Sequence, residues 1–241
     1  MKEGIFLAMD TSNREGSVAI GEGSPGGGVA VLARAILHSD EEHAASLATK
    51  VHGLLEGAGF QPSHLSGIVV GAGPGSFTGV RVGAATAKAM SWALEIPLWA
   101  FSSLAGAAAG IGEDPVRPRL VLFDARGERV YAGGFRVLAE KVETLISPTA
   151  TTVGEVLDSL IPPGALLMGD GAVRHRDLLE GAGHRILLPP SGWPSASGLL
   201  RLLTLDPGSG RVSNRSRWEP DYLREAGAAR MWKGRKEWRG R

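Results

Sequence analysis

Two aspartates stand where this sequence could hold a metal ion. Asp10 follows the apolar run at 5–9, and Asp124 follows a similar run that begins at residue 120. Carboxylates at strand ends can bind a hydrated magnesium ion, so Asp10, its neighbour Thr11 and Asp124 are the candidate residues of a nucleotide and magnesium site. Aspartates also begin turns, because their side chains accept hydrogen bonds from nearby backbone N–H groups. The sequence leaves both interpretations open.

The stretch GAGPGSFTGVRVG at 71–83 is glycine-rich, as phosphate-binding loops are. A P-loop requires a lysine at the start of its helix, whereas Lys88 lies about three turns further along. A dinucleotide-binding loop requires a third glycine where Ser76 stands, and Pro74 removes one backbone N–H donor. The stretch therefore predicts a tight turn from a strand into a helix, with Ser76 as the N-terminal cap.

Histidine and cysteine usage argues against a zinc or thiol enzyme. The chain has no cysteine, which excludes disulfides, thiolate metal sites and cysteine nucleophiles. Its six histidines stand at positions 38, 43, 52, 64, 175 and 184. No two of them are four residues apart, the spacing that zinc-binding helices use. The sequence predicts no catalytic residue, no metal ligand and no cofactor.

Hydrophobic patterning predicts the elements that position these residues. Five apolar runs in the first half indicate strands, and the first three, separated only by turns, form an antiparallel meander. These runs lie at 5–9, 17–20, 29–37, 67–71 and 97–101. One helix is expected after the capping-box pair Ser39 and Glu42, and a second over about 77–94.

The second half of the chain resembles a shortened repeat of the first. The segment 120–137 again runs from a strand through an aspartate and a turn into a second strand. It is followed by a helix near 153–160, the segment 165–173 and a strand-like run at 185–190. This order predicts an α/β fold of two units, each built on a mixed sheet.

Three regions follow from this order: units at 1–105 and 106–225, and a basic tail at 226–241. The boundary between the units falls in the alanine- and glycine-rich segment around 101–116. Residues 211–241 hold ten basic residues against four acidic ones, a net charge of +6. Basic residues beside Trp232 and Trp238 could contact RNA, and the alternative is a solvated chain end.

The helix expected at 77–94 carries small residues at three- or four-residue spacing, including Gly83, Ala84 and Ala87. Glycine inside a helix costs about 1 kcal/mol relative to alanine, so close packing is the expected compensation. The small face packs either against the protein's own first helix or against a partner chain.

The first residues do not look like a targeting segment. Glu3 and Asp10 flank an apolar run that is too short for a signal peptide or a membrane span. We therefore expect a cytoplasmic protein that does not enter the membrane.

Several segments together resemble the bacterial TsaB (YeaZ) family. They are DTS at 10–12, HAASL at 43–47, GAGPGSFTGVRVGAATAKAMSWALEIPLWAFSSL at 71–104, DARGERVYAGGF at 124–135 and PDYLRE at 220–225. The resemblance implies the ASKHA fold of actin-like ATPases and sugar kinases, made of two RNase-H-like mixed-sheet units. It also implies a non-catalytic scaffold subunit in the formation of threonylcarbamoyladenosine next to the anticodon of tRNA.

The resemblance further implies a set of partners. Family members pair with the transferase TsaD, or with themselves, through their first two helices; TsaE is a small ATPase of the same assembly, and tRNA is reached through the complex. When the family's interface is carried over to this sequence, the resemblance implies the interface residues Leu47, Val51, Leu54, Val80, Gly83, Ala84 and Ala87. The TsaD metal motif HxxxH is absent here. The alternative functions are an ATP- and magnesium-dependent phosphotransferase or ATPase of the same fold, and a zinc peptidase.

Overall fold

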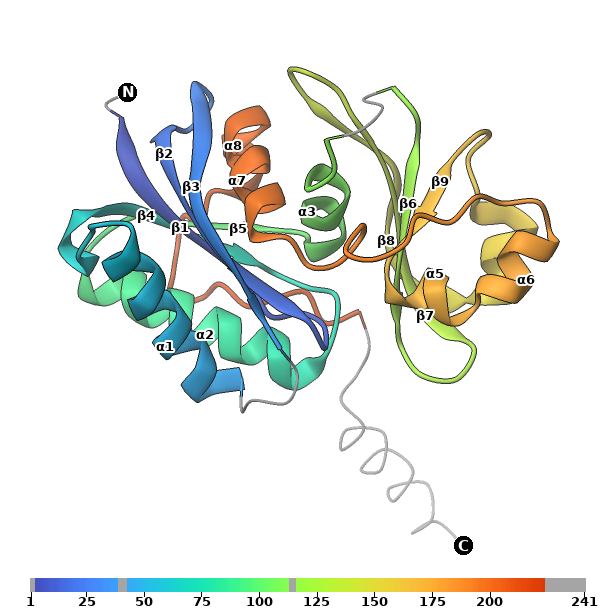
Figure 1. The fold of residues 1–241 in the computed structure, drawn as a ribbon, viewed down its shortest axis with the longest axis horizontal. Coiled ribbons are helices and arrows are strands. Elements are labelled where there is room, and N and C mark those ends of the chain that lie inside the picture. The colour runs from blue at the N-terminus through green and yellow to red at the C-terminus, as the bar shows by residue number, and fades with distance from the viewer. Residues whose placement is uncertain (1–2, 39–42, 113–115, 224–241) are drawn as a thin grey trace, which may run out of the picture.

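The computed structural model describes residues 3–38, 43–112 and 116–223 (Figure 1). The first half forms a five-stranded sheet in the order β3-β2-β1-β4-β5. Its strands are β1 (Gly4–Asp10), β2 (Gly16–Ser24), β3 (Gly28–Leu37), β4 (Leu65–Gly71) and β5 (Leu98–Phe101). The first three pair antiparallel, whereas β4 pairs parallel with both β1 and β5, so the predicted meander and mixed sheet are confirmed.

Two helices cover one face of this first sheet. They are α1 (His43–Gly57) and α2 (Phe77–Ala93), and a short 3-10 turn, η1 (Pro62–His64), precedes β4. Apolar side chains from both helices and from β1, β2 and β4 form a core between the layers. Ser76 caps α2 by accepting a hydrogen bond from the Gly79 backbone N–H, as predicted. The predicted capping box of Ser39 and Glu42 lies outside the described residues.

The second half forms a four-stranded sheet in the order β8-β7-β6-β9. Its strands are β6 (Arg119–Asp124), β7 (Arg129–Val137), β8 (Val142–Thr152) and β9 (Leu166–Met168). Its outer face is covered by α4 (Val153–Glu155), the π turn η2 (Val156–Leu160), α5 (Asp170–Arg174) and α6 (Arg176–Gly181). The strand-like run at 185–190 contributes only a bridge between Leu167 and Ile186, which corrects the prediction of a strand there.

The two sheets follow one plan. In each, an antiparallel meander of three strands is joined by a strand parallel to the first. This duplication of mixed sheets confirms the predicted α/β, ASKHA-type fold of two RNase-H-like units.

Two helices lie between the sheets in Figure 1, α3 (Ser103–Ala109) and α7 (Ala196–Leu205). Together with the facing sides of both sheets they enclose a continuous apolar core. The two helices approach closely because a side chain at Gly198 would collide with the Gly106 carbonyl oxygen. The segment around 101–116, expected as a boundary, therefore contains a buried helix.

After α8 (Pro207–Gly210), residues 211–223 return to the first sheet, and we call them the C-terminal strap. The Val212 backbone N–H donates to the Leu98 carbonyl of β5 at 3.0 Å, and Asp221 N–H donates to the Ala72 carbonyl at 2.8 Å. The strap thus follows α2 and the edge of the sheet in Figure 1. None of the helices within the described ranges combines the length and apolar character needed to cross a membrane.

Candidate functional site

Asp10 ends β1 with a fully buried carboxylate. Its Oδ1 accepts hydrogen bonds from the Ser12 backbone N–H at 3.0 Å and from the Ser103 hydroxyl at 3.1 Å. Burial raises the pKa of Asp10, while the hydrogen bonds from Ser12 and Ser103 oppose that rise. The carboxylate also lies against Gly71, where any side chain would collide with it. Asp10 is therefore enclosed by its own chain.

Thr11 connects the turn after β1 to the start of α2. Its hydroxyl donates to the Gly79 carbonyl oxygen at 2.7 Å, and the Ser76 backbone N–H donates to the Ser12 carbonyl at 2.6 Å. Side chains at Gly75 or Gly79 would collide with the backbone of Ser12 or Thr11. The glycine-rich turn thus permits close contact between two backbone segments, as the sequence predicted for a turn without a phosphate.

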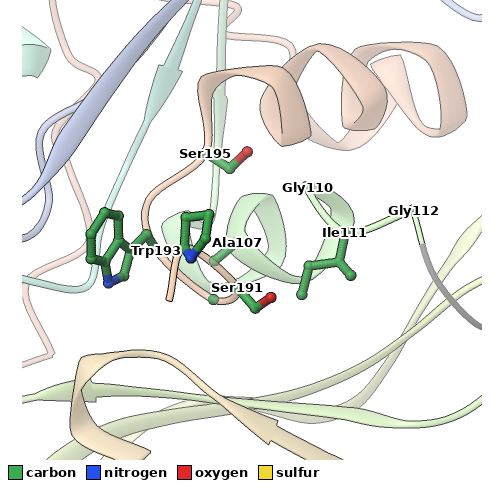
Figure 2. A pocket seen from close by; sticks show the side chains of 9 residues that line it. Ala107, Gly110, Ile111, Gly112, Ser191, Trp193 and Ser195 are labelled. Carbon is green, nitrogen blue, oxygen red and sulfur yellow. The ribbon is translucent and has the colours of Figure 1, made fainter. Parts of the chain in front are cut away.

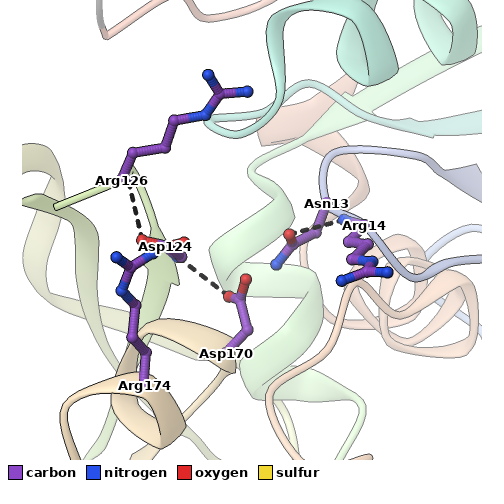
Figure 3. A network of polar contacts seen from close by, with 6 residues as sticks. All are labelled: Asn13, Arg14, Asp124, Arg126, Asp170 and Arg174. Atoms are coloured by element: carbon purple, nitrogen blue, oxygen red, sulfur yellow. Dashed lines mark hydrogen bonds and ion pairs between the residues drawn. The ribbon is translucent and has the colours of Figure 1, made fainter. Parts of the chain in front are cut away.

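Asp124 occupies the equivalent position at the end of β6 (Figure 3). Its Oδ1 accepts from the Arg126 backbone N–H at 2.8 Å, and its Oδ2 pairs with Arg174 Nη1 at 2.7 Å. In both turns the aspartate accepts a hydrogen bond from the backbone N–H two residues further along the chain, Ser12 for Asp10 and Arg126 for Asp124. Both aspartates therefore begin turns with the same local bond. These local hydrogen bonds are the ones that the interpretation of Asp10 and Asp124 as turn residues predicts.

The second unit adds an acid that the sequence analysis missed. Asp170 begins α5, and its Oδ1 accepts a hydrogen bond from the Asp124 backbone N–H at 3.1 Å (Figure 3). Burial raises the pKa of Asp170, and a hydrogen bond from the Asn13 side chain opposes the rise. Asn13 follows β1, so this contact joins the two units. The sequence signal that could have revealed it is an acid two residues after β9, the strand that corresponds to β4.

A magnesium site at Asp10 and Asp124 stays a prediction. In the part of the chain that the structure describes, no group of three His, Cys, Asp or Glu side chains has metal-binding geometry. One oxygen of the Asp10 carboxylate faces Gly71, and one oxygen of Asp124 is neutralised by Arg174. A cation at Asp124 would have to displace Arg174, whereas Oδ2 of Asp10 is buried and accepts no hydrogen bond from the described residues.

The seven residues expected at a partner interface lie mainly inside the chain. Six of them are buried, and Leu54 is half-buried; the buried six are Leu47, Val51, Val80, Gly83, Ala84 and Ala87. Gly83 lies against Thr11, because a side chain there would meet the Thr11 hydroxyl. Ala87 of the same ridge belongs to the core that includes Leu47 and Val51 of α1. A partner interface at these seven residues stays a prediction.

The opposite sides of the same helices face outward. Exposed positions on α1 include Ala48, Gly53 and Glu56, and on α2 they include Ala85 and Ala89. A side chain added at Gly53 would meet no atom of the chain. Small residues therefore form part of the exposed surface of α1 and α2, and another helix could approach closely there.

A cavity of about 240 Å³ opens between the end of α3 and the loop before α7 (Figure 2). It is lined by Ala107, Gly110, Ile111, Gly112, Pro190, Ser191, Gly192, Trp193 and Ser195. None of these side chains is ionisable near neutral pH. The cavity therefore lacks the acid, base or charged group that most catalytic sites require.

Known proteins share both the sequence and the fold. The family model described as TsaD: tRNA N6-adenosine threonylcarbamoyltransferase matches residues 31–176. The Bacillus subtilis tRNA threonylcarbamoyladenosine biosynthesis protein TsaB is 32% identical over 179 residues, which are 73% of this chain and 75% of that protein. Its Haemophilus influenzae namesake is 26% identical over 246 residues, covering 93% and 95% of the two chains.

A solved structure agrees with these relatives. YeaZ from Pseudomonas aeruginosa superposes with a TM-score of 0.72 at 26% identity, over 91% of this chain and all of that one. The sequence match to B. subtilis TsaB and the shared arrangement of two mixed sheets lead to one conclusion. The chain belongs to the TsaB (YeaZ) family.

Proposed function

We propose that this protein is a non-catalytic subunit in the biosynthesis of threonylcarbamoyladenosine in tRNA, and that it supports a TsaD-type transferase. The observation that carries the proposal is the use of Asp10 and Asp124 as turn residues in a TsaB-family fold. The positions at which a catalytic member of this fold class could bind magnesium serve here to join backbone segments. No specific observation favours the phosphotransferase alternative.

We further propose that the partner binds the exposed surface of α1 and α2. Ala48, Gly53, Ala85 and Ala89 leave the backbones of both helices accessible to close packing. The same family model describes TsaD and matches this chain, so TsaD would present a similar helix pair. Two similar surfaces can pair about an approximate two-fold axis, which also accounts for a competing homodimer. TsaE would join this assembly, and tRNA would be bound by the complex in the cytoplasm.

The division of the chain remains a proposal as well. We assign 1–105 and 106–225 to the two units because each holds a complete sheet, and 226–241 to a basic tail. The α7 helix and the C-terminal strap nevertheless cover the first sheet, so the second unit contributes to the environment of α2.

Reconstitution of tRNA modification tests the proposed function. Purified TsaD and TsaE, unmodified tRNA, ATP and a threonylcarbamoyl donor are incubated with and without this protein, and the modified nucleoside is measured by mass spectrometry. We expect product only when the protein is present, and none from the protein alone. Modification at full rate without it, or by it alone, would refute the scaffold role.

A further inference from the structure

The proposed function does not use the cavity between the end of α3 and the loop before α7, which we call the α3 cavity (Figure 2). Its volume is about 240 Å³. An engineered protein cavity of about 150 Å³ is large enough for benzene, and sites for drug-sized molecules begin at about 300 Å³. The α3 cavity therefore matches the size of one ring or of two fused rings.

Hydrogen bonds hold both walls of the α3 cavity in place. On the α3 side, the Ile111 carbonyl oxygen accepts from Arg119 Nη1 at 3.0 Å and from Arg201 Nη1 at 3.3 Å. On the loop side, the Ser17 hydroxyl of β2 donates to the Pro194 carbonyl oxygen at 2.9 Å. The walls are therefore in position before a ligand arrives, and this lowers the entropy cost of binding.

The side chains that line the α3 cavity favour an uncharged, flat ligand. None of them is ionisable near neutral pH, so a charged ligand would lose its hydration without gaining an opposite charge from the lining. Trp193 and Ile111 lie on opposite sides of the view in Figure 2, and both are half-buried. The Trp193 indole offers a surface on which an aromatic ring can stack. An uncharged aromatic ring therefore fits this lining better than a charged or a non-aromatic group.

One polar group of the lining is available to a ligand. The Ser191 hydroxyl forms no hydrogen bond with residues 3–38, 43–112 or 116–223, whereas the Ser195 hydroxyl accepts from the Gly198 backbone N–H at 3.0 Å. A serine hydroxyl can donate one hydrogen bond and can also accept. A ring nitrogen that carries a lone pair is an acceptor for this donor. The lining thus favours a nitrogen heterocycle over a hydrocarbon ring.

We propose that the α3 cavity binds a small uncharged nitrogen heterocycle of one or two fused rings, which stacks on Trp193 and accepts a hydrogen bond from Ser191. The inference does not rest on the proposed function, because α3 and α7 lie between the sheets whereas α1 and α2 cover the other face of the first sheet. The ligand contacts the two segments through which the chain passes between the sheets. Its binding should therefore stabilise the junction of the two units.

Nuclear magnetic resonance with the isotope-labelled, full-length protein tests this proposal. The probes are purine and benzimidazole; benzoate is the matched charged ring, and cyclohexanol is the matched ring that cannot stack. Purine should shift the backbone N–H signals of Gly110, Ser191 and Gly192 and the indole signal of Trp193, with a Kd of about 1 mM or tighter. At about 5 mM purine the thermal midpoint should rise by about 2–4 °C. Benzoate and cyclohexanol should each bind at least about fivefold more weakly.

Variants of the lining and matched controls make the result specific. Trp193→Leu removes the stacking surface, and Ser191→Leu removes the hydroxyl and fills the cavity, so each should weaken purine binding about tenfold. Ser191→Ala keeps the cavity open and should weaken binding about fivefold through the lost hydrogen bond, even where a bulkier variant fails to fold. Ser63→Leu in the exposed η1 turn and Trp92→Leu at the exposed end of α2 should bind purine like the unaltered protein.

Three outcomes would overturn the inference. The first is no signal shift with either heterocycle at about 5 mM, and the second is a set of shifts confined to residues outside the lining. The third is purine affinity that is unchanged in folded Ser191→Leu and Trp193→Leu. None of these measurements involves TsaD or tRNA, so they reject this inference and leave the proposed function intact. Purine binding by a protein that does not support tRNA modification would reject the proposed function alone.

Discussion

Thr11 and Gly79 are joined by a hydrogen bond of 2.7 Å between the threonine hydroxyl and the glycine carbonyl oxygen. The bond connects the turn after β1 to the first turn of α2, at a contact so close that only glycine fits at position 79. The position of α2, on which the proposed partner surface depends, is therefore set by the β1 turn.

Replacing Gly79 tests this contact. Gly79→Ala places a methyl group against the Thr11 carbonyl oxygen, so the free energy of unfolding should fall by about 2 kcal/mol or more. Gly53→Ala is the matched control in α1, where the methyl group meets no atom of the chain. That variant should gain about 0.5–1 kcal/mol from helix propensity. Urea denaturation of the isolated proteins measures both, and equal effects would contradict the predicted contact.

Adjacent alanines on α2 separate stability from partner binding. Ala85 is exposed and Ala84 is buried, with 4% of its surface accessible. Ala85→Arg should leave the thermal midpoint unchanged and weaken association with TsaD at least about tenfold, because the small surface becomes obstructed. Ala84→Arg should instead lower the free energy of unfolding by about 3 kcal/mol or more, since it buries a charge. Unchanged association of the folded Ala85→Arg protein, measured by biolayer interferometry, would place the interface elsewhere.

The buried Asp10 carboxyl should make stability depend on pH. Because the pKa of Asp10 is raised in the folded protein, its protonated form stabilises the fold below the ordinary pKa of 3.8. That contribution is lost as the pH rises from 3.8 toward the raised pKa. Asparagine cannot ionise, so the free energy of unfolding of Asp10→Asn does not fall for this reason. As the pH rises through this range, the variant should therefore become more stable relative to the unaltered protein. Denaturation of both proteins at a series of pH values tests the sign, and a difference independent of pH would contradict it.

The same substitution distinguishes a turn residue from a magnesium ligand. An asparagine oxygen can still accept from Ser12 and Ser103, so Asp10→Asn should support tRNA modification at a rate close to that of the unaltered protein. Asp10→Ala leaves both donors buried without an acceptor and should lose about 1–3 kcal/mol of stability. Loss of activity in folded Asp10→Asn, together with calorimetric binding of ATP and magnesium by the unaltered protein, would favour the phosphotransferase.

Much of the fold could be predicted from the sequence because its strands and turns have local signatures. The meander, the N-terminal cap of α2 at Ser76 and the equivalent positions of Asp10 and Asp124 follow from apolar periodicity and turn chemistry. The edge strand β8 was missed because its side chains are mostly half-buried, without a clear alternation of buried and exposed positions, and because Pro148 interrupts it. The buried helix α3 was missed because its small residues match those of a linker, and its packing partner Gly198 is distant in sequence.

The candidate site was predictable only in part. Periodicity groups Val51, Val80 and Ala87 on inward faces, but an inward face has the same pattern whether it meets a sheet or another subunit. Family resemblance predicts that these two helices form the interface, and the structure shows which of their sides are exposed. The pairing of Asp124 with Arg174 and Asp170 depends on tertiary contacts that no local pattern encodes.

The C-terminal strap and α7 have a consequence for synthesis on the ribosome. Both segments cover the sheet made by the first hundred residues, yet they are translated only after the whole second sheet. Domains generally fold as they emerge, N-terminal part first. A nascent chain that ends before α7 would therefore carry an uncovered apolar sheet face containing Ala19, Val69 and Trp99. This unit becomes complete only after α7 and the strap have been translated, so termination before α7 should yield a product prone to aggregation and proteolysis.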